Sequence, residues 1–185
     1  MGGQLSQPLS LYLMILFHDL STTPDWQTRQ WVCQIAKDLR QTDKDEIRAT
    51  NPTLTIGDPD PEAILWMSIR YSKDAWVITK DDVAFCIFGA GPSGDPDLGT
   101  VWLLASTVLD TDRAAKKAVA KNTQPAVERW HQSWPKLANW IDIRNVMTLR
   151  WLTWAGFEIR DVDLEHGREK RPFYFIQKTK ETPDV

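Results

Sequence analysis

Residues 137–159, LANWIDIRNVMTLRWLTWAGFEI, decide the fold, because they predict a strand, a helix and a second strand in close succession. Residues 140–143 alternate apolar and polar side chains, which is typical of a short strand. Asn145 offers a side-chain oxygen to the unpaired N–H groups at the start of a helix over residues 146–155. Gly156 supplies a left-handed residue that ends this helix. Because the helix is apolar nearly all round, we expect it to lie inside the domain.

Apolar runs elsewhere in the chain predict the rest of the sheet and its helices. Strands are predicted over residues 11–18, 75–79, 83–89, 100–105 and 171–176, and helices over 26–39, 42–48, 62–71 and 110–134, the last with a break at Pro125. Strands that alternate with helices, with hairpins among them, favour an α/β (α+β) fold with a mixed, mostly antiparallel central sheet flanked by helices. We expect a single domain over residues 11–178, a flexible leader over 1–10 and a frayed tail over 179–185.

The glycine-rich segment 89–99, GAGPSGDPDLG, is predicted to connect two strands. A phosphate-binding loop joins a strand to a helix N-terminus, whereas here another strand follows. Asp95 and Asp97 would also repel phosphate. Calcium binding by these two acids is the weaker alternative, because Ca²⁺ takes about six to eight oxygen ligands.

The bulk properties exclude several classes of protein. The net charge of −3 argues against a general nucleic-acid binder, which is usually basic. The apolar run 9–17 is too short to span a membrane, and it lacks the basic leader and cleavage site of a signal peptide. Residues 1–6 match a myristoylation pattern, but a leader before the first strand is the favoured interpretation. Cys33 and Cys86 lie in apolar segments and are predicted to be buried, reduced thiols.

Asn145, Thr148-Leu149 and Gly156-Phe157 resemble the Asn-x-x-Ala-x-x-x-Tyr-x-x-x-Gly-Phe segment of the GNAT-type N-acetyltransferases. A wider set of cues resembles the internal virion proteins of short-tailed phages, a small family with a GNAT-like fold. These cues are DLRQTDKDEI at 38–47, Ala75-Trp76, Val101-Trp102-Leu103, the Trp-rich helix and Asp142-Ile143-Arg144-Asn145. The resemblance covers residues 38–175 and implies the GNAT fold.

The same resemblance implies a cofactor site that this chain does not match. GNAT enzymes bind the acyl-CoA pyrophosphate at a strand-to-helix turn of the form Arg/Gln-x-x-Gly-x-Gly/Ala, where glycines let main-chain N–H groups approach the phosphates. Here the corresponding turn, 106–113, reads STVLDTDR and holds no glycine. Asp110 and Asp112 would repel phosphate, and only Arg113 would attract it. Many GNAT enzymes also carry a proton-donating Tyr seven residues after the helix Asn, and here that residue is Leu152.

Two functions follow from these residues. The favoured one is a virion or assembly protein without catalytic residues or cofactor, located in the virion or the host cytoplasm, which binds other virion or assembly proteins and neither binds nucleic acid nor spans a membrane. The alternative is an acetyl-CoA-dependent N-acetyltransferase that acts on an amine. The predicted partner-binding residues are Arg113, Lys116, Lys117, Trp130 and Trp134, and the cofactor contacts under the alternative are Leu104, Ala105, Ser106, Arg113 and Asn145. Inhibition or redirection of a host protein remains a third hypothesis.

Other chemistry has weaker signals. His18, His131 and His166 have no ligand-like spacing, so no metal site is predicted. Asp43 and Glu46 are a possible carboxylate pair, but a solvated helix face is the favoured interpretation.

Overall fold

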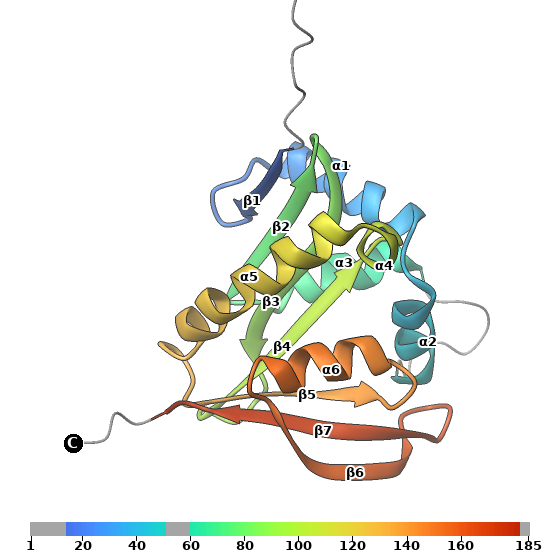
Figure 1. Ribbon diagram of the computed structural model, residues 1–185, viewed down its shortest axis with the longest axis vertical. Coiled ribbons are helices and arrows are strands. Elements are labelled where there is room, and N and C mark those ends of the chain that lie inside the picture. The colour runs from blue at the N-terminus through green and yellow to red at the C-terminus, as the bar shows by residue number, and fades with distance from the viewer. Residues whose placement is uncertain (1–13, 51–59, 182–185) are drawn as a thin grey trace, which may run out of the picture.

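The computed structural model describes residues 14–50 and 60–181, which form a seven-stranded sheet with helices on both faces (Figure 1). The strands lie in the order β1-β2-β3-β4-β5-β7-β6. Their bounds are β1 Ile15–Asp19, β2 Asp74–Lys80, β3 Val83–Pro92, β4 Leu98–Ala105, β5 Lys136–Asp142, β6 Glu158–His166 and β7 Arg171–Thr179. Neighbouring strands pair antiparallel except β4 and β5, so the predicted mixed, mostly antiparallel sheet is confirmed.

The parallel pair β4 and β5 stays together only briefly. Its register joins Leu98 to Lys136 and ends where Thr100 meets Ala138. Beyond this point the two strands diverge, as Figure 1 shows. We call the space between β4 after Thr100 and β5 after Ala138 the β4–β5 gap. It separates one arm of the sheet, β1 to β4, from the other, β5 to β7.

The helices cover the two faces of the sheet unequally. Their bounds are α1 Asp25–Lys37, α2 Gln41–Thr50, α3 Pro61–Arg70, α4 Val108–Thr111, α5 Arg113–Trp130 and α6 Val146–Trp154. One apolar core joins α1 and α3 to β2 and β3, and a second, larger core packs α5 and α6 against the opposite face. Helix α2 lies beside the open end of the β4–β5 gap (Figure 1).

Several predicted boundaries need correction. Strand β1 begins at Ile15, and residues 11–13 of the predicted strand, like the leader 1–10, lie outside the described residues. The long helical region breaks at Asp112, which caps α5, whereas Pro125 lies inside α5. At the other end, β7 continues through Thr179, and the Lys180 N–H donates to Pro135 O (2.8 Å). These bonds place the start of the predicted tail within the sheet.

The glycine-rich segment connects two strands, as predicted, but most of it belongs to those strands. β3 runs to Pro92 and β4 starts at Leu98. Gly91 is required by close packing, because a Cβ there would lie 2.2 Å from Tyr71 O. Gly91 therefore leaves room for the main chain at Tyr71, and the segment serves as a connection between two strands.

The prediction that the helix after Asn145 lies inside the domain is wrong. In α6 only Leu152 is buried, while Val146, Met147 and Trp154 are 48%, 50% and 61% exposed. The helix packs one face on the sheet and turns the other outward. A helix that is apolar on both faces is still half exposed when only one layer of structure covers it.

Candidate functional site

The β4–β5 gap holds a cavity of about 360 Å³. Aromatic side chains form much of its wall, together with polar groups from α2, β5, β6 and the residue that caps α6. The aromatic lining residues include Phe17, Phe88, Trp102, Trp140 and Trp151, and the polar ones include Glu46, Asn139, Asn145 and His166. A mostly apolar cavity with a few converging polar groups is the usual form of a small-molecule site.

The edge of β4 that faces the gap has main-chain groups directed toward the cavity. The Ala105 N–H donates to Asp43 Oδ2 (2.9 Å), and the Ala105 carbonyl accepts from the Arg40 N–H (2.9 Å), so both groups point away from β3. Successive residues of a strand direct these groups to alternate sides. Those of Leu103 therefore point into the gap, where the described β4–β5 ladder has already ended at Thr100.

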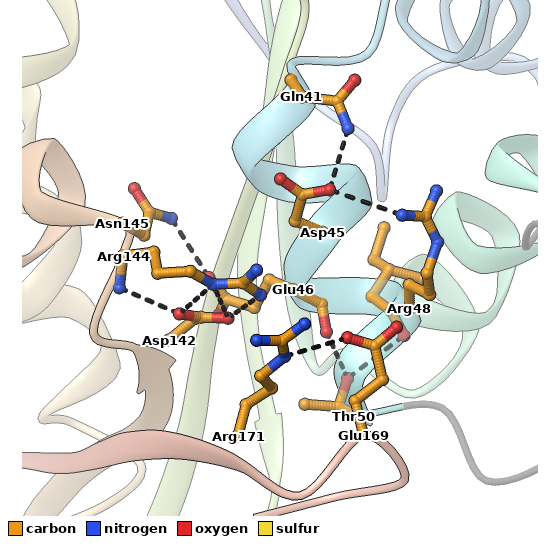
Figure 2. Close-up of polar contacts among 11 residues, drawn as sticks. Gln41, Asp45, Glu46, Arg48, Thr50, Asp142, Arg144, Asn145, Glu169 and Arg171 are labelled. Atoms are coloured by element: carbon orange, nitrogen blue, oxygen red, sulfur yellow. Dashed lines mark hydrogen bonds and ion pairs between the residues drawn. The ribbon is translucent and has the colours of Figure 1, made fainter.

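Helix α2 connects the two arms of the sheet across the mouth of the gap. On the β4 side, Asp43 bonds the Ala105 N–H and forms a buried ion pair with Arg40 (2.6 Å). On the β5 side, Asn145 Nδ2 donates to Glu46 Oε2 (3.1 Å), as Figure 2 shows. The end of α2 also contacts the β6–β7 turn, because Ala49 O accepts from the Arg168 N–H (2.7 Å).

Glu46 is the carboxyl group placed for chemistry. Its pKa is raised from 4.5 to about 8, chiefly by burial. The hydrogen bond from Asn145 and the charge of Arg40 lower the pKa, and the Asp43 and Asp142 carboxylates raise it. Asp142 stays ionised because the hydrogen bonds from Arg144 outweigh its burial and leave its pKa lowered. A carboxyl with a pKa near neutrality can both accept and release a proton at working pH.

Asn145 begins α6, as predicted, and also serves the cavity. Its side-chain oxygen accepts from the Thr148 N–H (3.4 Å), while its amide nitrogen holds Glu46. Leu152, at the position where the resemblance expects a proton-donating Tyr, lines the same cavity. The described cavity wall thus offers a buried acid in α2 and no phenol at that position.

The turn after β4, residues 106–112, is closed by bonds within the protein. The Ser106 N–H donates to Phe85 O (2.8 Å) and the Thr107 N–H to Asp38 O (3.0 Å). At the start of α5, the Asp112 carboxylate accepts from the Ala115 N–H (2.9 Å) and pairs with Lys80. Hydrogen bonds from Lys80 and Ala115 lower the pKa of Asp112, so a fixed negative charge lies at this helix N-terminus.

The predicted cofactor contacts are not brought together as a set. Leu104 and Asn145 line the cavity, but its lining includes neither Ala105, Ser106 nor Arg113. The main-chain groups of Ala105 and the N–H of Ser106 already have partners in Asp43, Arg40 and Phe85. Arg113 is exposed at the first position of α5.

Trp130 and Trp134, two of the predicted partner-binding residues, do not lie on the surface. Each is 7% exposed, and Trp130 Nε1 donates to Asp74 Oδ2 (2.6 Å). The Trp134 ring fills the space over Gly99, where a Cβ would lie 2.7 Å from it. Of the basic partner-binding candidates, Arg113 and Lys117 are exposed and Lys116 is half-buried. Both tryptophans are core residues, and Trp134 packs on the start of β4.

Sequence reasoning underrated α2. Asp43 and Glu46 were expected on a solvated helix face, yet Asp43 is 3% exposed and Glu46 is partly buried at the cavity. The available signal was their spacing, which puts both acids on one side of a helix. Among residues 14–50 and 60–181, no cluster of three or more metal-ligating side chains occurs and no helix is long and apolar enough to cross a membrane.

Comparisons with known proteins identify the fold. No protein-family model and no curated protein matches the chain. Among solved structures, a ribosomal-protein-alanine N-acetyltransferase from Brucella melitensis is 17% identical with a TM-score of 0.58, over 89% of this chain and 99% of that one. The ribosomal-protein-S18-alanine N-acetyltransferase from Escherichia coli is 9% identical with a TM-score of 0.59, over 93% of this chain and 99% of that one. A Bacillus subtilis acetyltransferase in complex with CoA is 10% identical with a TM-score of 0.55, over 91% of this chain and 100% of that one. The chain has the GNAT acetyltransferase fold.

The cavity and the turn beyond it differ in what they leave open to a ligand. The cavity and the Leu103 edge of β4 offer room and main-chain groups beside Glu46. The 106–112 turn does not fit a pyrophosphate, because the N–H groups of Ser106, Thr107, Leu109 and Asp110 are bonded to protein oxygens and Asp112 caps the start of α5.

Proposed function

We propose that this protein transfers an acyl group from a thioester to an amine, with Glu46 as the general base. The observation that carries the proposal is the Glu46 carboxyl in the β4–β5 gap, held by Asn145 at 3.1 Å and with its pKa raised to about 8. The GNAT fold of the chain supports the same reaction class. Fold alone does not establish an activity, so the proposal depends on the Glu46 site.

In this reaction Glu46 removes a proton from the amine. The ionised carboxylate accepts that proton at an Oε atom, while Asn145 keeps the side chain directed at the cavity. A base with a pKa near the working pH is effective because it is partly ionised and still basic enough to take the proton. The aromatic walls exclude water from the reacting groups, and Trp102, Trp140 and Trp151 also suit a cationic amine before it loses its proton.

Amine-dependent release of thiol tests the proposal. The protein is incubated with an acetyl thioester and a panel of primary amines, and free thiol is followed with a thiol-reactive dye. We expect release that requires both protein and amine. Glu46→Gln should lower the rate by about 100-fold or more, because general bases contribute roughly 10²- to 10⁴-fold.

Glu128→Gln is the matched control, because Glu128 is an exposed glutamate on α5. Its rate should equal that of the wild type. Absence of amine-dependent release across the panel, or an unchanged rate for Glu46→Gln, would contradict the proposal.

A second candidate function is a non-catalytic assembly protein on the same scaffold. The bonded 106–112 turn favours it, because that turn is where GNAT enzymes hold their cofactor. Under this hypothesis the exposed basic residues Arg113 and Lys117 contact an acidic surface of another assembly or virion protein. Capture of defined particle proteins by the wild type, reduced by Lys117→Glu, would support this candidate. Absence of the protein from particles and assembly intermediates would contradict it.

A further inference from the structure

We infer that the acyl donor of the proposed reaction is a thioester on a pantetheine-type arm whose carrier places no nucleotide pyrophosphate at the 106–112 turn. The inference rests on the proposed function, because it names the donor for that reaction. It starts from a contrast between two parts of the chain. In the turn, the N–H groups of Ser106, Thr107, Leu109 and Asp110 are already bonded, whereas the edge of β4 beyond Thr100 no longer pairs with β5.

The first step concerns hydrogen-bond donors. A pyrophosphate at a strand-to-helix turn is held by main-chain N–H groups that point at it. Here the Ser106 and Thr107 N–H groups donate to Phe85 O and Asp38 O. The Leu109 and Asp110 N–H groups turn back to Ser106 O and Thr107 O, both at 3.0 Å. A phosphate would have to displace these internal acceptors.

The second step concerns charge. The start of α5 is capped by Asp112, whose carboxylate takes the position relative to the helix that an anionic ligand would take. Lys80 is the cation beside Asp112, and its charge is already paired with that carboxylate. Two further acids flank the turn: Asp38, which accepts from Thr107 Oγ1 (2.5 Å), and Asp110, which lies 3.7 Å from Arg40. Arg40 is itself committed to Asp43.

The third step concerns the part of a donor that the gap can hold. A pantetheine-type arm is an extended chain with two amide groups, and such a chain can bond an exposed strand edge as an added strand does. The Leu103 N–H and C=O point into the gap and provide that edge. The thioester at the end of the arm would then lie in the cavity that Glu46 lines.

The bonds made and broken balance without any further reactant. The amine nitrogen loses a proton to Glu46 and forms a bond to the acyl carbon, and the C–S bond breaks. The departing thiolate takes up a proton from water, and Glu46 later returns its own proton to the solvent. The described cavity presents Leu152, which cannot supply that proton, at the position of the expected Tyr.

Titration calorimetry of the unmodified protein with three probes tests the inference. The probes are acetyl-CoA, S-acetylpantetheine and ADP, the last of which carries a pyrophosphate without an arm. We expect acetyl-CoA and S-acetylpantetheine to bind with affinities within about threefold of each other, and ADP neither to bind nor to compete with S-acetylpantetheine.

The possible outcomes separate this inference from the proposed function. Acetyl-CoA binding more than about 30-fold tighter than S-acetylpantetheine, or competition by ADP, would overturn the inference and leave the acyltransferase proposal standing. Failure of both thioesters to bind at millimolar concentration would overturn both. Equal binding of the two thioesters, together with faster thiol release when amine is added, would support both.

Discussion

The β4–β5 gap and the 106–112 turn lie next to each other along β4, yet they use their main-chain groups in opposite ways. In the gap, the Leu103 groups point into a cavity after the β4–β5 ladder has ended. At Ala105 and beyond, every N–H described above is bonded to a protein oxygen. A partly buried carboxyl and an open strand edge therefore lie beside a turn that the protein fills with its own atoms.

The difference between the two regions comes from α2 and the residues just before it. The segment that joins α1 to α2 lies against the end of β4, where Leu39 bridges Ser106 and Arg40 bonds Ala105. The same helix brings Glu46 to the cavity from its next turn. The segment before α2 thus covers the end of β4, and α2 itself supplies the Glu46 carboxyl to the gap.

Removal of Asp43, which holds the end of β4 through Ala105, should have the largest effect on stability. Asp43→Ala leaves Arg40 buried at 4% exposure without its carboxylate and frees the Ala105 N–H. Breaking a buried ion pair by removing one partner costs about 3–5 kcal/mol. We expect the free energy of unfolding, measured by urea denaturation followed by circular dichroism, to fall by this amount.

Asp45→Ala is the control for this prediction. Asp45 lies on the same helix and pairs with Arg48 at the surface (3.6 Å, with side chains 34% and 36% exposed). Surface pairs contribute about 0–1 kcal/mol, so this variant should unfold close to the wild type. Equal losses for the two variants would mean that Asp43 does not hold the end of β4.

The pH dependence of stability should show whether the Glu46 carboxyl in the gap has a raised pKa. Its pKa rises from 4.5 in the unfolded chain to about 8 in the fold, so the folded protein keeps a proton that the unfolded chain releases. Unfolding then becomes easier as pH rises from about 4.5 to 8. Relative to Glu46→Gln, the wild type should lose on the order of 5 kcal/mol across this window, because each pKa unit corresponds to about 1.4 kcal/mol.

Urea denaturation of both proteins at several pH values measures this difference. The three histidines, which also titrate within this window, are present in both proteins, so their contribution cancels. A difference that stays constant across the window would show that Glu46 titrates normally and would remove the support for a tuned base.

The same pKa predicts how transfer activity responds to pH. Glu46 acts as a base only when ionised, so kcat/KM should rise with pH and level off above about 8. The rate at pH 7 should be roughly a tenth of the rate at pH 9, because one pH unit below a pKa about a tenth of the groups are ionised. A rate that falls over this range would assign the transferred proton to another group.

The sequence predicted the regular elements well because their signals are local. Asn145 begins α6 and Gly156 ends it with φ 87°, as capping chemistry requires. The exposure of α6, the burial of Trp130 and the role of Glu46 could not be predicted, because each depends on which element packs opposite. Glu46 reaches the cavity only because strands far along the chain diverge there.

Arg113→Glu should have the smallest effect, and it tests whether a bound donor reaches the 106–112 turn. Arg113 is exposed at the start of α5 and is absent from the cavity lining, so it should not touch a donor bound in the gap. We expect the calorimetric Kd for acetyl-CoA to change by less than about threefold, and the same for Lys117→Glu, an exposed basic residue one helical turn later. A loss of about tenfold or more for Arg113→Glu alone would place phosphates beside α5. That result would mean that the bonded turn opens when the donor binds, and the contrast between the two regions would then describe only the ligand-free protein.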